Sequence, residues 1–349
     1  MQIEKKIFGQ DETGIVYKYL IENNGFKVEL CEIGASILSV IMKDGFGKET
    51  DVVLGLDSLE AYKRNWPAFG SVIGRYANRI KNASFKLDDN KYKLKNNIMG
   101  GCIHSGYGYH YRKWDSSFYE EDNKAHIIFE LFSENGDQGF PGNLKVKVEY
   151  IISDNNTLSV NYYYISDKKT AVNLTNHCYF NLSGYDSGNV FEHYLKINAK
   201  KVTQVDKKLM PTGKILDVEG SAFDFTVKKQ IKDNLDKGFK PFCYEKEYDI
   251  NYVLDKEPEE FLLIANLESQ VSKIGMNVYT DMPGMQFYTA NAVGGMKGKN
   301  GVKYEKNPAV CFETQFYPDA VNIREFPSPF IEADVEVHKR TDFEFYIIN

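Results

Sequence analysis

Two adjacent runs of the chain alternate apolar and polar residues with the two-residue period of a β-strand. They are NLKVKVEYII at 143–152 and TLSVNYYYI at 157–165. Between them stands Asp154-Asn155-Asn156, a group of residue types that is common in tight turns. The pattern predicts a β-hairpin over these residues, and it is the clearest hairpin signal in the sequence.

Other segments also favour strands. An opening β-meander is predicted over 15–41, with a turn at Asn23-Asn24-Gly25. Further short strands are expected near 195–203, 215–225 and 333–347. Helical periodicity is weak, because 57–65 predicts only one or two turns and 258–266 fits a helix or a strand.

Many short strands separated by turn signals are typical of a β-sandwich or a β-barrel. No low-complexity block, repeat or interdomain linker is visible, and all-β folds reach 349 residues as one unit. The 24 tyrosines and 23 phenylalanines favour strands and also suit sugar recognition, although a β-rich core alone would account for them. We therefore expect one all-β domain over 1–349.

Composition narrows the classes of function and the location. A net charge of −6 argues against nucleic-acid binding, and no apolar run is long enough for a transmembrane helix. The start, MQIEKKIFGQDE, lacks the apolar region of an export signal. The five cysteines are an odd number without a CxxC pair, which fits reduced thiols in a cytoplasm.

Two ionisable residues in apolar strand patterns are candidates for acid–base chemistry. His177 lies in AVNLTNHCYFNL at 171–182, and imidazole can exchange a proton near neutral pH. A core histidine satisfied by the backbone is an equally good interpretation. Glu313 lies in VCFETQ, where burial would raise the pKa of its carboxyl toward the range useful for a base. Without context, a solvated strand face explains Glu313 as well.

Weaker candidates for ligand contact are Arg79 in GRYANRI, Asp249 in YDINYVL and His104 in GGCIHSGYG. An ordinary ion pair would account for Arg79, and a mobile loop for His104. No HxxxH pair and no Cys/His cluster is present, so no transition-metal site is expected. The absence of GxSxG weakens a serine hydrolase interpretation.

Four strings carry a resemblance to a known family: GRYANRI (74–80), NLTNHCYFNL (173–182), MQFYTAN (285–291) and CFETQFYPDAVN (311–322). GDQGFPGNL (136–144) and DINY (249–252) add weaker support. Their order and content resemble the aldose 1-epimerases, or galactose mutarotases, from about residue 10 to the end of the chain. The strings TNHxYFNL and ETQxxPDA together are specific for that family.

The resemblance implies a single large antiparallel β-sandwich of the galactose mutarotase type, with few short helices and an open sugar-binding groove. It implies that Glu313 is the general base at the anomeric hydroxyl and His177 the general acid at the ring oxygen. By the same resemblance His104 is a second histidine near the ring oxygen. The family's sugar-contacting positions match Asn78, Arg79, Asp249 and Gln286. The resemblance implies an aldose substrate such as galactose or glucose and no metal or organic cofactor. A monomer or homodimer is expected, since the abundant aromatic residues suit a dimer interface but do not require one.

Three positions depart from the family pattern. H-S-G at His104, Ser105 and Gly106 replaces the usual H-G-G, and Ile250 replaces the histidine that commonly follows the aspartate. Tyr109-His110 stands where F-D is expected ahead of Trp114. None of these removes a proposed proton carrier, but Ser105 and Ile250 could alter sugar preference, so the substrate stays open.

Three other functions remain open at this stage. A hexose-6-phosphate 1-epimerase needs basic residues near the C6 phosphate, and no convincing cluster is visible. A non-catalytic carbohydrate-binding protein would not require both His177 and Glu313. A glycosidase using Asp249 and Glu313 needs its two carboxylates about 5–10 Å apart, which sequence does not reveal.

Overall fold

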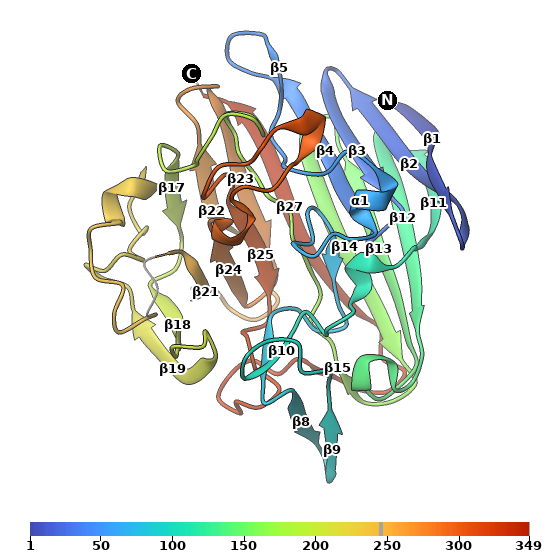
Figure 1. Cartoon of the computed structure of the whole chain (residues 1–349), viewed down its shortest axis with the longest axis vertical. Coiled ribbons are helices and arrows are strands. Elements are labelled where there is room, and N and C mark those ends of the chain that lie inside the picture. Colours follow the sequence, from blue (N-terminus) through green and yellow to red (C-terminus); the bar gives the residue numbers. More distant parts are fainter. Residues whose placement is uncertain (244–246, 349) are drawn as a thin grey trace.

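The computed structural model describes residues 1–243 and 247–348, and the regular secondary structure of these residues is almost entirely antiparallel β-strand (Figure 1). The predicted hairpin is confirmed as two neighbouring strands of a nine-stranded sheet, with Leu144 opposite Ser166. In spatial order that sheet contains β11 (Asp115–Glu121), β12 (Lys124–Ser133), β13 (Leu144–Ile152), β14 (Thr157–Ser166), β27 (Val337–Ile347), β23 (Ile274–Thr280), β22 (Leu262–Glu268), β17 (Tyr194–Ile197) and β20 (Lys229–Gln230).

Two five-stranded sheets accompany it. The first contains the meander predicted over 15–41, and its five strands are β1 (Gln2–Asp11), β2 (Gly14–Asn23), β3 (Phe26–Cys31), β4 (Ser36–Lys43) and β5 (Glu49–Asp51), of which β1 and β5 lie outside the predicted range. The second follows the order β19 (Pro211–Asp217), β18 (Lys201–Val205), β21 (Asp249–Val253), β24 (Gly284–Tyr288) and β25 (Cys311–Gln315).

Short ribbons and turns connect these sheets. Four two-stranded pairs are β7 (Arg79–Lys81) with β10 (Gly101–Ile103), β8 (Ser84–Leu87) with β9 (Asn90–Lys93), β6 (Val72–Ile73) with β16 (Thr175–Asn176), and β15 (Thr170–Ala171) with β26 (Phe330–Ile331). The helical segments are α1 (Leu59–Tyr62) and the 3-10 turns η1 (Tyr109–Tyr111), η2 (Asp137–Gly139), η3 (Ile231–Asn234), η4 (Asn291–Val293) and η5 (Lys299–Gly301).

The core lies between the sheets. One apolar cluster contains buried residues of all three large sheets, among them Val28 of β3, Val148 of β13 and Phe287 of β24. Strands β3 and β13 alternate buried with more exposed positions, whereas β24 is buried on both faces except at its last residue. The expected all-β sandwich is therefore confirmed.

The predicted helix at 57–65 is confirmed as α1, whose Ser58 hydroxyl caps the first turn by accepting a hydrogen bond from Ala61 N–H. The ambiguous segment 258–266 contributes to strand β22. The strand expected over 215–225 ends at Asp217, so its second half was wrong. In the part of the chain described here, no helix is long and apolar enough to cross a membrane.

Candidate active site

Three neighbouring strands of the second five-stranded sheet bring Asp249, Gln286 and Glu313 together. Gln286 on β24 lies directly opposite Glu313 on β25, and β21 pairs with the other edge of β24. The Gln286 amide donates a hydrogen bond of 2.5 Å to the Asp249 carboxylate. Because register is fixed by antiparallel pairing on both edges of β24, these polar groups are held at one place on the sheet.

His177 reaches the same place from a different part of the fold. The backbone of His177 is fixed after β16, where its N–H donates to Ser71 O and its carbonyl accepts from Gly70 N–H. The His177 Nε2 atom lies 3.5 Å from Glu313 Oε1. An imidazole and a carboxylate that are 136 positions apart in the sequence thus lie side by side, as the family resemblance implied.

Aromatic rings hold the His177 imidazole in place. The ring of Tyr179 stacks on it with centroids 4.8 Å apart and an interplanar angle of 14°. Tyr288 meets His177 edge to face at 6.1 Å. The Tyr179 hydroxyl donates to Pro67 O at 2.8 Å, which fixes the stacked ring. Sequence reasoning missed both tyrosines, although the alternation of NHCY would have placed Tyr179 on the same side as His177.

The third group of site residues lies on the β7–β10 ribbon and its ends. Asn78 N–H donates to His104 Nδ1 at 3.2 Å, so the proton of a neutral His104 imidazole belongs on Nε2. The His104 and His177 rings lie 5.6 Å apart. Arg79 Nη2 forms an ion pair of 3.1 Å with Asp249 Oδ2, which joins the ribbon to β21.

Burial shifts the protonation of the acid–base pair. Glu313 and His177 are 2% and 5% exposed. Desolvation, reinforced by the nearby Asp249 charge, raises the pKa of the Glu313 carboxyl well above its usual value. Desolvation lowers the pKa of His177 to about 4, against an opposing effect of Asp249. Burial also lowers the pKa of His104, and nearby His177 acts in the same direction.

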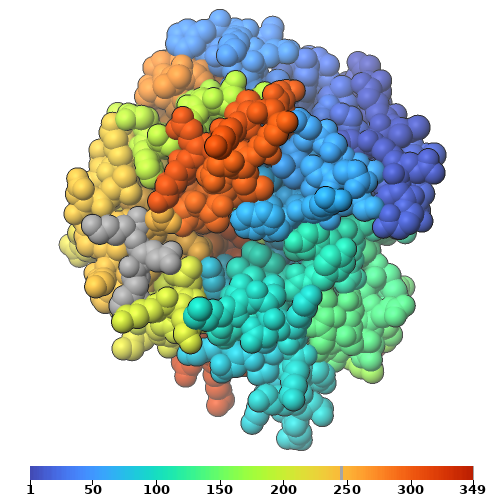
Figure 2. All heavy atoms as spheres, viewed as in Figure 1, coloured from blue at the N-terminus to red at the C-terminus, as the bar shows by residue number. Residues whose placement is uncertain are grey.

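Several buried polar atoms of this group have no hydrogen-bond partner among the described residues: Glu313 Oε2, His177 Nδ1 and Gln286 Oε1. Buried polar groups are normally paired, and a bound ligand is one way in which such atoms find a partner. A polyhydroxylated molecule offers both donors and acceptors at short spacing. In Figure 2 a hollow lies near the middle of this face, over β24 and β25 as they appear in Figure 1.

The same residues also have the geometry of a possible metal site. One ligand atom each from His104, His177 and Glu313 lies within 4.8 Å of the others. Spacing in the sequence could not reveal this group, because its members come from three distant segments. The expectation that no metal takes part stays a prediction.

The departures from the family pattern lie around the site rather than in it. Ser105 Oγ accepts a hydrogen bond from Tyr76 N–H and donates one to Tyr76 O, so it fastens the His104 loop to the segment before β7. Ile250 is fully buried and points to the opposite face of β21 from Asp249. His110 is buried, and burial together with the charge of His177 lowers its pKa to about 3.

Comparison with known proteins shows which family this chain is similar to. The family model described as aldose 1-epimerase matches residues 17–344. The galactose mutarotases of Bos taurus and Homo sapiens are each 37% identical, with 99% of both chains covered. The aldose 1-epimerase of Escherichia coli K12 is 33% identical over 93% of this chain and 94% of its own.

Solved structures give the same result for the fold. An aldose epimerase homologue from C. elegans superimposes with a TM-score of 0.85 at 29% identity, covering 95% of this chain and 98% of its own. The galactose 1-epimerase of Lactobacillus acidophilus covers both chains completely with a TM-score of 0.87 at 24% identity, which bears on the fold alone. The chain therefore belongs to the aldose 1-epimerase family.

Proposed function

We propose that this protein is an aldose 1-epimerase, an isomerase that interconverts the α and β anomers of hexoses such as galactose and glucose. The observation that carries the proposal is the buried pair of His177 Nε2 and Glu313 Oε1, 3.5 Å apart. Opening a cyclic hemiacetal requires one proton to leave the O1 hydroxyl and another to reach the ring oxygen. A carboxylate and an imidazolium at this separation can serve both atoms of one sugar.

The proposed reaction starts with Glu313 ionised and His177 protonated. Glu313 takes the O1 proton, the C1–O5 bond breaks with its electrons going to O5, and His177 donates its proton to O5. The aldehyde then rotates about C1–C2, O5 attacks the other face of C1, and both protons return. A correctly placed general acid or general base typically accelerates such a reaction by a factor of about 10²–10⁴.

Burial of the pair suits the intermediate. With the open-chain aldehyde bound, Glu313 is protonated and His177 is neutral, and these are the forms that desolvation favours for both groups. The pair holds one proton in both states, but its transfer from His177 to Glu313 by way of the sugar neutralises the two opposite charges. Burial therefore reduces the free-energy difference between the cyclic and open-chain complexes, while the net charge of the site stays the same.

In the proposal, His104 stands beside the ring oxygen, and Asn78, Arg79, Asp249 and Gln286 bind sugar hydroxyls. The ion pair with Arg79 and the amide of Gln286 hold the Asp249 carboxylate in one orientation. A carboxylate engaged in this way is suited to accepting hydroxyl bonds rather than to attacking an anomeric carbon. This argues against the glycosidase alternative.

Polarimetry of freshly dissolved α-galactose and α-glucose tests the proposal. We expect the protein to accelerate the decay of rotation, and dialysis against EDTA to leave the rate unchanged. Acceleration with glucose 6-phosphate but not with glucose would favour the hexose-6-phosphate epimerase. Release of the aglycone from an aryl galactoside would favour a glycosidase, and sugar binding without acceleration would favour a binding protein.

A cytoplasmic location is part of the same proposal. Cys31, Cys102, Cys178 and Cys311 are free thiols, and all five cysteines are buried, as expected for a protein that folds in a reducing compartment. A monomer or homodimer is also proposed, and light scattering of the purified protein measures which one forms.

A further inference from the structure

The β7–β10 ribbon carries binding residues but has little support from the main sheets. It is a separate two-stranded ribbon, with Arg79 opposite Ile103 and Lys81 opposite Gly101. Asn78 and Arg79 lie at one end of β7, and His104 follows β10 directly. The inner side chain of the ribbon, Ile80, packs in a small apolar cluster outside the main core.

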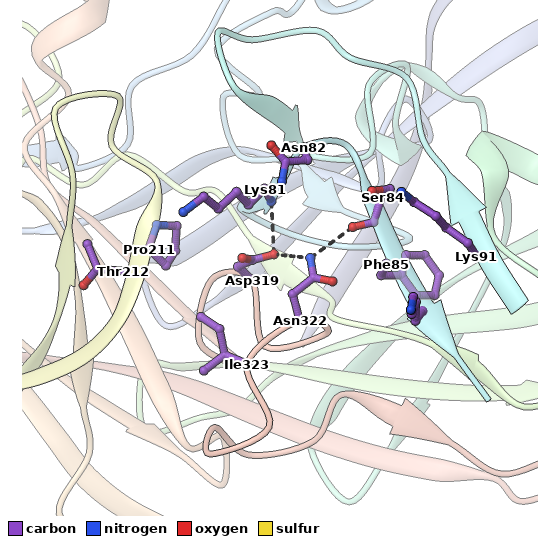
Figure 3. Close-up of a pocket in the computed structure, with 11 residues that line it drawn as sticks. Lys81, Asn82, Ser84, Phe85, Lys91, Pro211, Thr212, Asp319, Asn322 and Ile323 are labelled. Atoms are coloured by element: carbon purple, nitrogen blue, oxygen red, sulfur yellow. Dashed lines mark hydrogen bonds between the residues drawn. The ribbon is translucent and has the colours of Figure 1, made fainter. Parts of the chain in front are cut away.

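Asp319 occupies the open edge of β7. Its backbone N–H donates to Arg79 O at 2.8 Å, and its carboxylate Oδ1 accepts from Lys81 N–H at 3.0 Å. The free edge of β7 is thus bound at two points by one residue. The carboxylate is held in turn by Asn322, whose amide also donates to Ser84 O, as the dashed lines in Figure 3 show.

The same segment of chain carries the proposed base. Asp319 lies six positions after Glu313, beyond the end of β25, and the string ETQFYPDA contains both. Val321, two positions after Asp319, packs with Ile80 in the small apolar cluster. The turn that follows β25 therefore contacts the ribbon through hydrogen bonds and through apolar packing.

We propose that Asp319 is a positioning residue, which sets the place of Asn78, Arg79 and His104 relative to Glu313 by fixing the ribbon to the turn after β25. This inference rests on the proposed function, because it assigns Arg79 and Asn78 to sugar binding. Releasing the ribbon would displace binding residues, whereas Glu313 and His177 stay on their own supports. The Michaelis constant should then change more than kcat.

The burial and the raised pKa of the Asp319 carboxyl support a role beyond stability. Asp319 is 2% exposed and borders a cavity of about 420 Å³ (Figure 3). Burial raises the pKa of its carboxyl to about 6, and the bonds from Asn322 and Lys81 offset this only in part. A raised pKa means that the folded state is most stable with this group protonated, and that stability declines as the pH rises through about 6. An asparagine would avoid this cost at neutral pH.

Asp319→Gly is the decisive variant, since the residue has φ of +61°, which glycine adopts without strain. We expect KM for galactose to rise at least tenfold with kcat within about threefold of the parent. Asp319→Asn keeps the acceptor oxygen and should restore KM. Its melting temperature should exceed that of the parent by about 2–4 °C at pH 7.5, and the difference should shrink at pH 4.5.

Asp334→Gly is the matched control, because Asp334 is an exposed aspartate with φ of +59°. Its kinetics should match the parent. If Asp319→Gly does not fold, Asn322→Ala, which removes one bond to the carboxylate, should raise KM in the same direction by a smaller factor. An unchanged KM in the folded variants would overturn the inference, whereas an inactive parent protein would overturn the proposed function instead.

Discussion

The proposed site combines a rigid part with a tethered part. Glu313 and Gln286 stand on β25 and β24, strands of five residues that pair within a five-stranded sheet. Asn78 and His104 flank a ribbon with strands of three residues, and both have positive φ values, 63° and 51°. Such backbone conformations cost free energy and persist only where surrounding contacts impose them.

This difference suggests a division of labour. Proton transfer is sensitive to small changes in distance, so the proposed base belongs on a sheet whose register is fixed. Recognition of hydroxyl groups tolerates adjustment, and a ribbon held by side-chain bonds can supply it. Changes at Glu313 on the sheet should therefore lower kcat, and changes at the binding residues of the ribbon should raise KM.

The largest effect is expected for Glu313→Gln, which keeps the shape of the side chain and removes the base. We expect kcat for α-galactose to fall by about 10²–10⁴, measured by polarimetry. Calorimetry should show that galactose still binds, because the ribbon residues are unaffected. A kcat within tenfold of the parent would contradict the role of Glu313.

Arg79→Met tests the ribbon part. Hydrogen bonds to charged groups are worth about 1.5–3 kcal/mol, so we expect KM to rise about 10–100-fold while kcat changes less. Arg340→Met is a matched control, because Arg340 pairs with Asp342 on β27 of the nine-stranded sheet. A fall in kcat that exceeds the rise in KM would contradict the division between the two parts.

The pH dependence of kcat/KM tests the acid–base pair. The reaction requires the pair to hold one proton, and a second proton leaves it without a base. Since burial lowers the pKa of His177 to about 4, we expect activity to persist at pH 5.5 and to fall as the pH approaches 4. Circular dichroism at each pH separates this loss from unfolding. A fall centred on pH 6.5 in the folded protein would indicate an imidazole of ordinary pKa instead.

The sequence predicted the strongly alternating strands but not all of the strands at the edges of the sheets. Strands β1 and β11 were missed, because they are largely exposed on both faces and lack the alternation that marks a half-buried strand. Strand β12 was missed as well. Conversely, the ambiguity at 258–266 could not be resolved locally, because pairing with β23 decides that Leu262 begins a strand.

For the site, local patterns did not decide whether His177 and Glu313 take part in acid–base chemistry or have structural roles. The family strings favoured acid–base chemistry, but only by resemblance. The distance between the two side chains depends on strand register and on the path of the chain after β16, which no local pattern encodes. Asp319 illustrates the limit most clearly. Asp319 lies within CFETQFYPDAVN (311–322), one of the strings that carry the family resemblance. Its hydrogen bonds to β7 nevertheless depend on a contact between residues far apart in the sequence.

The smallest effect is expected for Ser105→Gly, which restores the family's H-G-G. The serine hydroxyl forms two bonds with the Tyr76 backbone, and their loss should loosen the ribbon slightly. Ser105 also has φ of +58°, a conformation in which glycine is free of strain, so the two effects oppose each other. We expect KM for galactose and for glucose to change less than threefold, with kcat unchanged. A change in the galactose-to-glucose preference beyond that range would make Ser105 a determinant of specificity, and would show that the ribbon selects the sugar as well as binding it.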